Sequence, residues 1–256
     1  MAEHEEGKGR LPPPATIEAE ARFLLGRRGG PLRDKRVVVT AAGTHEPIDP
    51  VRFIGNRSSG KMGYAIATAA RDRGALVTLV SGPAELEPPD GVELCRFERV
   101  ADLLEAIISR YGDADALIMV AAVADFRVAE VTDHKLKRGS SGLALHLVPN
   151  PDLLAETARL PIPRHPVRVG FAAETDDLER QAADKLARKQ LDLIVANDVS
   201  RPGSGFGTDT NRVVLLWPDG RRAALPLLSK ADVAERILDA VRDLIEKKVR
   251  ADERDG

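Results

Sequence analysis

Residues 37–63 read VVVTAAGTHEPIDPVRFIGNRSSGKMG, and this stretch decides the fold. It begins with Val37–Thr40, a β-branched run that is typical of a buried strand. A loop rich in Gly and Pro follows and prevents the strand from continuing. An amphipathic helix comes next, because four apolar residues recur at i, i+3, i+4 and i+7, namely Met62, Ala65, Ile66 and Ala69. A buried strand, a long loop and a helix in this order predict an α/β fold.

The helix start carries Ser58, Ser59 and Gly60, where backbone N–H groups and the positive end of the helix dipole point outward. Small residues there let a phosphate or carboxylate approach the backbone. The alternative is that one of the serines only caps the helix. The loop before the helix favours the anion site, because it has roughly twenty residues and loops of that length are usually functional. It contains neither GxxxxGK[ST] nor GxGxxG, so it is neither a Walker loop nor a dinucleotide fingerprint.

Composition excludes several classes of protein. The 256 residues contain 38 Lys and Arg against 40 Asp and Glu, so no strong field selects nucleic acids or acidic membranes. Aromatic residues make up only 4% and offer few stacking platforms for bases. Cys95 is the single cysteine, expected as a small core residue, and it suits a reducing compartment. Without a membrane-length apolar run or an apolar signal core, we expect a soluble, cytoplasmic protein.

Strands and helices alternate along most of the chain. This rhythm indicates βαβ crossovers and predicts a three-layer α/β/α, Rossmann-like fold with a mostly parallel sheet. The helix at 100–111 is expected to turn Leu103, Leu104, Ile107 and Ile108 inward. The further strands are predicted at 75–80, 92–97, 116–120, 167–171 and 193–196, and the next helix at 177–190.

Two segments break this rhythm and predict antiparallel structure. Residues 143–148 read LALHLV and resemble a strand with no helix before it. Residues 212–225 form a hairpin pattern that turns at Pro218-Asp219-Gly220. We expect these pieces to form a small antiparallel arm or flap, with dimerisation as one role.

The ends of the chain are expected to carry one helix each. Thr16 can cap a short helix that Gly26 ends, and the last helix is predicted from Ser229 to about Arg250. The predicted organisation is an N-terminal linker or tail at 1–34, one folded domain at 35–250 and a C-terminal tail at 251–256.

Asp125 follows the strand at 116–120, and ligands of open α/β sheets bind outside the carboxyl ends of the strands. A turn or helix cap is its alternative role. Ten residues later, Lys135-Leu136-Lys137-Arg138 forms a basic loop. It is either a solvated run of charge or a mobile clamp for a triphosphate.

Lys185 and Lys189 share one helix face, with Arg188 beside them, and are either surface charges or ligands. Asn150-Pro151-Asp152 is typical of a helix start, with Asn150 as the cap and Pro151 as the first helical residue. The histidines show no metal-ligand spacing, and no GxSxG elbow is present.

Five segments together resemble phosphopantothenate–cysteine ligase: GTHEPIDPVRFIGNRSSGKMG, AAVADF followed by KLK, VPNPDLL, VGFAAET and LIVANDVS. The resemblance covers about residues 35–245, which makes 35–250 the ligase domain. It implies that the carboxylate of 4′-phosphopantothenate attacks CTP to give an acyl-cytidylate and pyrophosphate. The amine of cysteine then expels CMP. The resemblance also implies Mg²⁺, shared by the triphosphate oxygens.

The resemblance assigns roles residue by residue. Asn56 matches the asparagine that handles the acyl-cytidylate, and Lys135 matches the first lysine of the KxKK loop that helps to form it. Ser58, Ser59 and Gly60 keep the anion role. Arg138 departs from the motif, since arginine keeps the charge but changes the geometry. The implied CTP site consists of Asp125, Lys135, Pro151, Asp152, Leu153, Leu154, Phe171, Lys185 and Lys189.

Two other functions stay open at this point, a dinucleotide-dependent reductase on the same layout and a non-catalytic interaction subunit. The missing GxGxxG and the basic KLKR loop argue against the reductase. The family implies a homodimer and small-molecule substrates. Residues 7–25 also resemble the linker that joins such ligases to a flavin-dependent decarboxylase, which implies a fused or associated decarboxylase.

Overall fold

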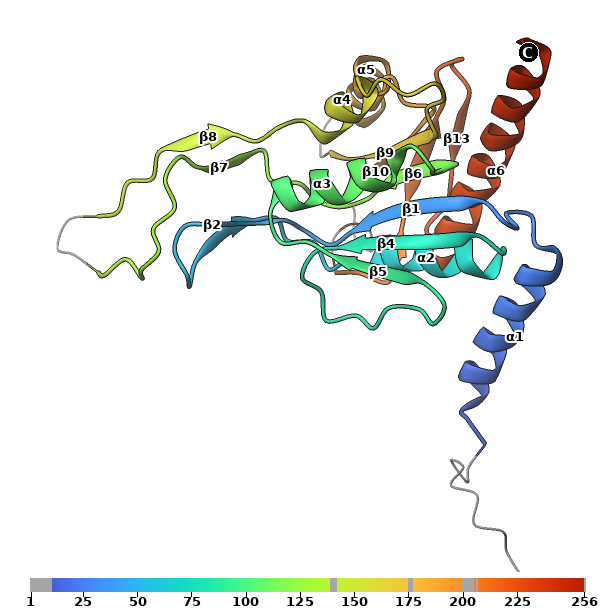
Figure 1. Cartoon of the computed structure of the whole chain (residues 1–256), viewed down its shortest axis with the longest axis horizontal. Coiled ribbons are helices and arrows are strands. Elements are labelled where there is room, and N and C mark those ends of the chain that lie inside the picture. The colour runs from blue at the N-terminus through green and yellow to red at the C-terminus, as the bar shows by residue number, and fades with distance from the viewer. Residues whose placement is uncertain (1–10, 139–141, 175–176, 199–204, 206, 256) are drawn as a thin grey trace, which may run out of the picture.

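A computed structural model of the chain describes residues 11–138, 142–174, 177–198, 205 and 207–255 (Figure 1). The helices are α1 (Pro14–Gly29), α2 (Lys61–Asp72), α3 (Val100–Tyr111), α4 (Leu153–Ala158), α5 (Leu178–Arg188) and α6 (Lys230–Asp255). The first strands are β1 (Arg36–Ala41), β2 (His45–Pro47), β3 (Phe53–Gly55), β4 (Leu76–Ser81), β5 (Glu93–Arg96), β6 (Ala116–Met119) and β7 (Phe126–Val128). The others are β8 (Leu147–Pro149), β9 (Val167–Glu174), β10 (Leu193–Asp198), β11 (Thr210–Asn211), β12 (Val213–Leu216), β13 (Arg222–Ala224) and β14 (Leu228–Ser229).

The centre of the fold is an eight-stranded sheet in the order β13-β12-β10-β9-β6-β1-β4-β5. The six strands β10, β9, β6, β1, β4 and β5 run parallel to one another. At one edge β12 pairs antiparallel with β10, and β13 pairs antiparallel with β12. From β1 the chain first proceeds outward through β4 and β5 and then returns to β6 on the other side of β1. The order therefore reverses between β1 and β6, and such a switch point opens a crevice at the carboxyl ends of the strands.

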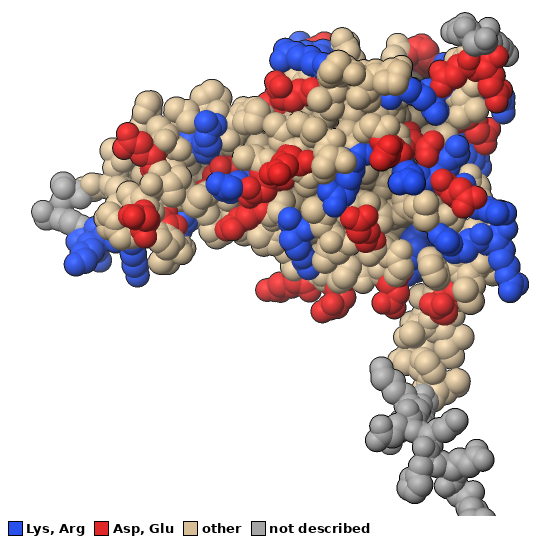
Figure 2. All heavy atoms as spheres, viewed as in Figure 1, with Lys and Arg blue, Asp and Glu red and all other residues tan. Residues whose placement is uncertain are grey.

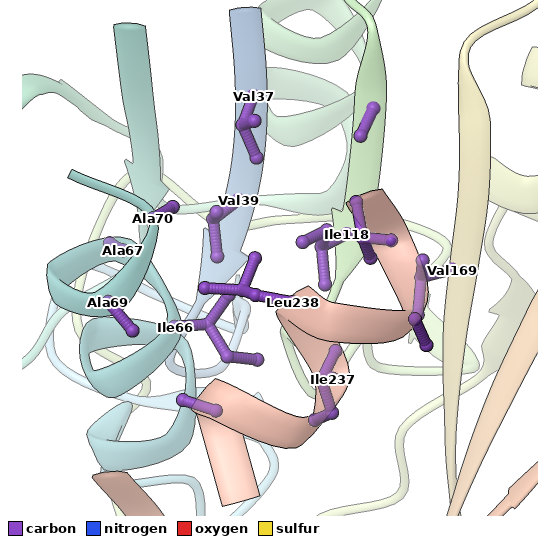
Figure 3. Packing of buried hydrophobic residues seen from close by; sticks show 14 of the residues in the cluster. Val37, Val39, Ile66, Ala67, Ala69, Ala70, Ile118, Val169, Ile237 and Leu238 are labelled. Atoms are coloured by element: carbon purple, nitrogen blue, oxygen red, sulfur yellow. The ribbon is translucent and has the colours of Figure 1, made fainter. Parts of the chain in front are cut away.

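Helices cover both faces of this sheet, which confirms the predicted three-layer α/β/α fold. The side chains of β1 alternate between the two faces, as the strand geometry requires. Val37 and Val39 pack with Ile66 of α2 and with Ile237 and Leu238 of α6 on one face (Figure 3). On the opposite face, Val38 of β1 packs with buried residues of α3, α4 and α5, including Leu103, Ile107, Leu153 and Leu186.

The arm is the second feature of the fold. It consists of two antiparallel pairs, β2 with β3 and β7 with β8, which project from one end of the sheet (Figure 1). The two pairs are joined by backbone contacts, for example from the N–H of Thr132 to the carbonyl oxygen of Ile48 at 3.2 Å. Both pairs follow strands that flank the switch point, so the arm and the crevice share the same connecting segments.

Three local predictions outside the cleft are wrong. Helix α1 begins at Pro14 and continues to Gly29, because Pro13 occupies the cap position and a proline fits the first turn, so Thr16 does not cap it. The hairpin at 212–225 extends the main sheet as β12 and β13 instead of joining the arm. Ile108 is 43% exposed on α3, since it lies at the edge of the apolar face.

The structure places other predicted elements close to their expected bounds. Helix α3 matches its prediction at Val100–Tyr111, and α6 extends beyond Arg250 to Asp255. Cys95 is half-buried in β5. Within the described residues, no helix combines the length and apolar character needed to cross a bilayer.

Candidate active site

A cleft of about 830 Å³ lies at the switch point, along the carboxyl edge of the sheet. Its walls come from the segments that follow β1, β6 and β9 and from the ends of α2, α4, α5 and α6. The sequence-predicted residues that line it are Asn56, Ser58, Ser59, Gly60, Asp125, Pro151, Asp152, Leu153, Leu154, Phe171, Lys185 and Lys189. Lys135 does not line this cleft.

Two buried threonines fix the segment that runs along the floor of the cleft. The hydroxyl oxygen of Thr40 accepts hydrogen bonds from the N–H groups of Val120 and Ala121, both at 3.0 Å. The Thr44 hydroxyl oxygen accepts one from the N–H of Ala124 at 2.9 Å. Because neither threonine exposes its side chain, these bonds hold the chain after β6 in one conformation beside β1.

Helix α2 begins at the cleft. Gly60 is its N-cap with φ of 78°, a left-handed conformation that favours glycine, and no side chain caps the helix. The N–H of Ser58 donates to the carbonyl oxygen of Asn56 at 2.8 Å. Because no side chain caps α2, neither serine has the capping role, and the N–H groups of the first turn have no partners inside the helix. This geometry suits an anion.

Asn56 connects the two loops that flank the switch point. Its side-chain Nδ2 donates to the carbonyl oxygen of Val123 at 3.0 Å. Val123 follows β6, whereas Asn56 follows β3, and the two residues are distant in the sequence. The side-chain amide thus connects the segment before α2 to the segment that carries Asp125, and Asn56 lines the cleft.

The α4 side of the cleft differs from its prediction in one respect. Asp152 is the N-cap of α4, and its carboxylate accepts a hydrogen bond from the N–H of Ala155 at 3.1 Å. Asn150 does not cap the helix, because its side chain donates instead to the carbonyl oxygen of Ala124 at 2.9 Å. Its backbone N–H donates to the carbonyl oxygen of Asp125 at 2.8 Å, and the Asp125 residue itself is exposed to the cleft.

Lys185 of α5 and Lys189, the C-cap of this helix, both line the cleft. Lys185 donates through Nζ to the carbonyl oxygen of Phe171 at 2.7 Å, and Lys189 forms an ion pair with Asp152. Arg188 also lines the cleft. The helix therefore brings positive charge to the same wall as the α4 N-terminus, where an anionic ligand is favoured.

Arg168 is a residue that sequence reasoning missed. It lies within β9 and is only 3% exposed. Its guanidinium donates to the carbonyl oxygens of Lys189 at 2.9 Å, Gln190 at 3.0 Å and Leu154, and burial lowers its pKa. It ties the end of α5 to the start of α4. An arginine inside a valine-rich strand is the only signal that could have indicated this role.

Two acidic residues of the long loop have structural roles. The carboxylate of Glu46 accepts a hydrogen bond from the N–H of Val100 at 2.7 Å, at the start of α3. Asp49 accepts hydrogen bonds from the N–H groups of Arg52 at 2.8 Å and Leu136 at 3.2 Å. Burial alone would raise the pKa of Asp49, but these backbone hydrogen bonds, together with one from Val51, keep it below its usual value.

The basic loop therefore belongs to the arm. The guanidinium of Arg52 donates to the carbonyl oxygen of Leu136 at 2.8 Å, which holds the loop against the turn between β2 and β3. Lys135, Lys137 and Arg138 are exposed. Figure 2 shows basic side chains at the tip of the arm, while both signs of charge are interspersed over the rest of the visible face.

Comparisons with known proteins agree with one another. The family model for the DNA/pantothenate metabolism flavoprotein C-terminal domain matches residues 32–245. The coenzyme A biosynthesis bifunctional protein CoaBC of Bacillus subtilis is 47% identical over 240 residues, which are 93% of this chain and 59% of that protein. This chain thus spans about three fifths of the length of that curated relative.

Two solved structures share the fold. The crystal structure of the C-terminal domain of CoaBC is 40% identical, with a TM-score of 0.74, and the match covers 86% of this chain and all of that one. A Cab2 mutant in complex with phosphopantothenate-cysteine has a TM-score of 0.71, with 94% of this chain and 97% of that chain covered. At 21% identity, the second match shows the fold alone.

Proposed function

The chain belongs to the family of the DNA/pantothenate metabolism flavoprotein C-terminal domain, and from this premise we propose that it ligates 4′-phosphopantothenate to L-cysteine with CTP. The observation that carries the proposal is the cleft at the switch point. It gathers twelve of the thirteen residues that the resemblance implies, from segments spread between Asn56 and Lys189. The curated relative acts in coenzyme A biosynthesis, and the distant Cab2 structure holds phosphopantothenate-cysteine, which agrees with this reaction class.

The first step activates the acid. A carboxylate oxygen of phosphopantothenate attacks the α-phosphorus of CTP, the new O–P bond forms, and the bond to the β-phosphate breaks to release pyrophosphate. In our proposal Asp125 holds the cytidine part and Pro151–Leu154 contribute backbone contacts. Phe171, Lys185 and Lys189 complete the nucleotide site, where positive charge offsets the charge that develops on the phosphates.

The second step forms the amide. The amine of cysteine attacks the acyl carbon, the C–N bond forms, the C–O bond to CMP breaks, and the amine loses its proton. We assign Asn56 to the acyl-cytidylate, because it lines the cleft and its side chain contacts the segment that carries Asp125. This chemistry needs polar groups around the reacting carbonyl and no covalent enzyme nucleophile.

Mg²⁺ fits this site as an ion carried by the nucleotide. Among the residues that the structure describes, no group of three or more His, Cys, Asp and Glu side chains could hold a metal. Mg²⁺ is commonly bound through one or two carboxylates together with substrate phosphates and water. Asp125 and Asp152 are exposed carboxylates of the cleft, either of which could contribute one ligand, and the bound ion would neutralise charge on the triphosphate.

The position of the Lys135 loop supports the proposal of a homodimer. Its loop lies in the arm and outside the cleft of its own chain. The arm also exposes large apolar side chains, including Val51 at 60%, Phe53 at 52% and Val131 at 54%. Apolar groups of this kind favour a protein interface. We propose that two chains pair through their arms and that each Lys135 loop reaches the partner's cleft.

The experiment that tests the reaction supplies CTP, Mg²⁺, phosphopantothenate and cysteine and follows pyrophosphate and CMP. We expect both products in equal amounts, no CMP release without cysteine, and ATP as a poor replacement for CTP. Asn56→Ala should release pyrophosphate without CMP, because the intermediate forms but is not consumed. Loss of both products would move Asn56 to an earlier step, and no products from the unaltered chain would refute the ligase proposal.

A mixing experiment tests the shared site. Asn56→Ala and Lys135→Met chains are each expected to be nearly inactive. If a site combines Asn56 of one chain with Lys135 of the other, a mixed dimer has one intact site. Equal mixing should then restore about a quarter of the unaltered activity, because half of the dimers are mixed. Mixing either variant with itself is the control, and an absence of rescue after confirmed exchange would contradict the shared site.

A further inference from the structure

Lys61 and Lys230 are the first residues of α2 and α6, the two helices that pack on the same face of the sheet. Both ammonium groups contact one short segment. Lys61 Nζ donates to the carbonyl oxygen of Gly207 at 3.1 Å, and Lys230 Nζ donates to that of Gly205 at 3.3 Å. The backbone N–H of Lys230 donates to the carbonyl oxygen of Asp209 at 3.0 Å. Two helix starts and two lysines therefore meet at one end of the cleft.

Lys230 is only 7% exposed. Its ammonium group donates to the carbonyl oxygens of Gly205 and Thr208, and it forms no ion pair with any carboxylate in the described part of the chain. Burial, and then the neighbouring charge of Lys61, lower the pKa of Lys230. A buried charge is costly unless it is paired, so an anion at this end of the cleft would supply the missing partner.

Lys61 forms an ion pair that is too exposed to prevent it from binding an anionic ligand. It pairs with Asp209 at 2.6 Å, but the Asp209 side chain is 87% exposed. An ion pair this exposed contributes little stability, because water competes for both charges. Lys61 and Lys230 bring two positive charges to this place and Asp209 brings one negative charge, so a positive charge remains beside the α2 N-terminus.

The cleft has two sides. Lys61 and Lys230 line it together with Ser58–Gly60, on the face of the sheet that α2 and α6 cover. Most residues assigned to the nucleotide lie in or next to α4 and α5, which cover the opposite face, whereas Phe171 of β9 packs on the α2 and α6 face. A ligand that bridges the carboxyl edge of the sheet would therefore have its nucleotide at one side and a second anionic group at the other.

We propose that Lys230 and Lys61 bind the phosphate monoester of the acid substrate, at the α2 and α6 side of the cleft. The inference rests on the proposed ligase function. A phosphate monoester carries about 1.5 to 2 negative charges at neutral pH and accepts several hydrogen bonds, which suits two ammonium groups and the free N–H groups of a helix start. In this arrangement the carboxylate at the other end of the acid lies near Asn56, where it meets the nucleotide.

The test compares phosphopantothenate with pantothenate, the same acid without its phosphate. Lys230→Met should raise the KM for phosphopantothenate about 10- to 100-fold, since a hydrogen bond to a charged group is lost. The KM for CTP should change less than about threefold, and the preference for phosphopantothenate over pantothenate should fall by the same factor as the KM rises. Lys230→Arg keeps the charge and should recover part of the preference. Lys247→Met, at an exposed position of α6, is the matched control.

Two results would overturn the proposal. A preference for the phosphorylated acid that is unchanged in Lys230→Met would show that the phosphate binds elsewhere. A larger rise in the KM for CTP would assign the lysines to the triphosphate instead. If Lys230→Met does not fold, as judged by circular dichroism, Lys61→Met undergoes the same comparison at a half-exposed position. Calorimetric titration of both acids needs no turnover, so it tests phosphate binding even if the unaltered chain forms no CMP and the ligase proposal fails.

Discussion

Replacing Arg168 with Met is expected to destabilise the fold by about 2–4 kcal/mol. The guanidinium donates to the carbonyl oxygens of Leu154, Lys189 and Gln190, and to the Thr157 hydroxyl oxygen at 3.3 Å. Met fills a similar volume but donates no hydrogen bond, and a buried acceptor without a partner costs about 1–3 kcal/mol. Water can replace the guanidinium at the exposed Gln190, and a buried guanidinium is itself costly, so the net loss is smaller than the sum over the acceptors.

Urea unfolding followed by circular dichroism measures this effect, and the melting temperature should fall by roughly 5–15 °C. Arg159→Met is the matched control, because Arg159 is the C-cap of α4 and its side chain is 75% exposed. We expect it to stay within about 0.5 kcal/mol of the unaltered chain. Arg168→Met should also raise the KM for CTP more than the KM for phosphopantothenate, since it loosens only the α4 and α5 side. Equal stability of the two variants would refute the reasoning.

Three further predictions concern packing, the arm and pH. Gly63→Ala should destabilise the fold by about 1–3 kcal/mol in urea unfolding, because the added Cβ would lie 2.6 Å from a β1 side chain. Gly112→Ala is the control, since its added Cβ meets open space and should leave the stability unchanged. Asp49→Ala frees the loop that carries Lys135 and should lower kcat about 10-fold or more, with full activity as the contradicting result. Burial and nearby cations lower the pKa of His165, so below about pH 6.5 the unfolded chain binds a proton that the folded chain does not, and stability falls. His165→Gln should lose part of this dependence in urea midpoints compared at about pH 7.5 and 5.5, and an equal decline would contradict the assignment.

The main sheet could be predicted because its signals are local. Val37–Thr40 and the run at 116–120 are buried on both sides, and such strands have near-continuous apolar sequences. The hairpin at 212–225 was predictable as a hairpin, since its turn residues lie between its two strands. Its place in the main sheet was not, because pairing of β12 with β10 depends on residues outside the hairpin.

The site was predictable to the extent that it follows from strand ends. Asp125 and Asn56 lie in segments after strands, and parallel strands bring such segments to one edge. The partners of Arg168 and Lys230 could not be predicted, because they are carbonyl oxygens contributed by other segments of the chain. The position of the Lys135 loop in the arm depends on Arg52 and on long-range contacts of the same kind.

The position of the arm also affects how the protein can be tethered. Helix α1 and the last turns of α6 lie at the opposite end of the molecule from the arm (Figure 1). A sensor surface or an affinity matrix attached beyond either helix would therefore leave the arms free for the proposed pairing and the cleft open to small molecules. Immobilisation through a cysteine introduced at Val51 should instead block the proposed subunit association while the central sheet stays intact.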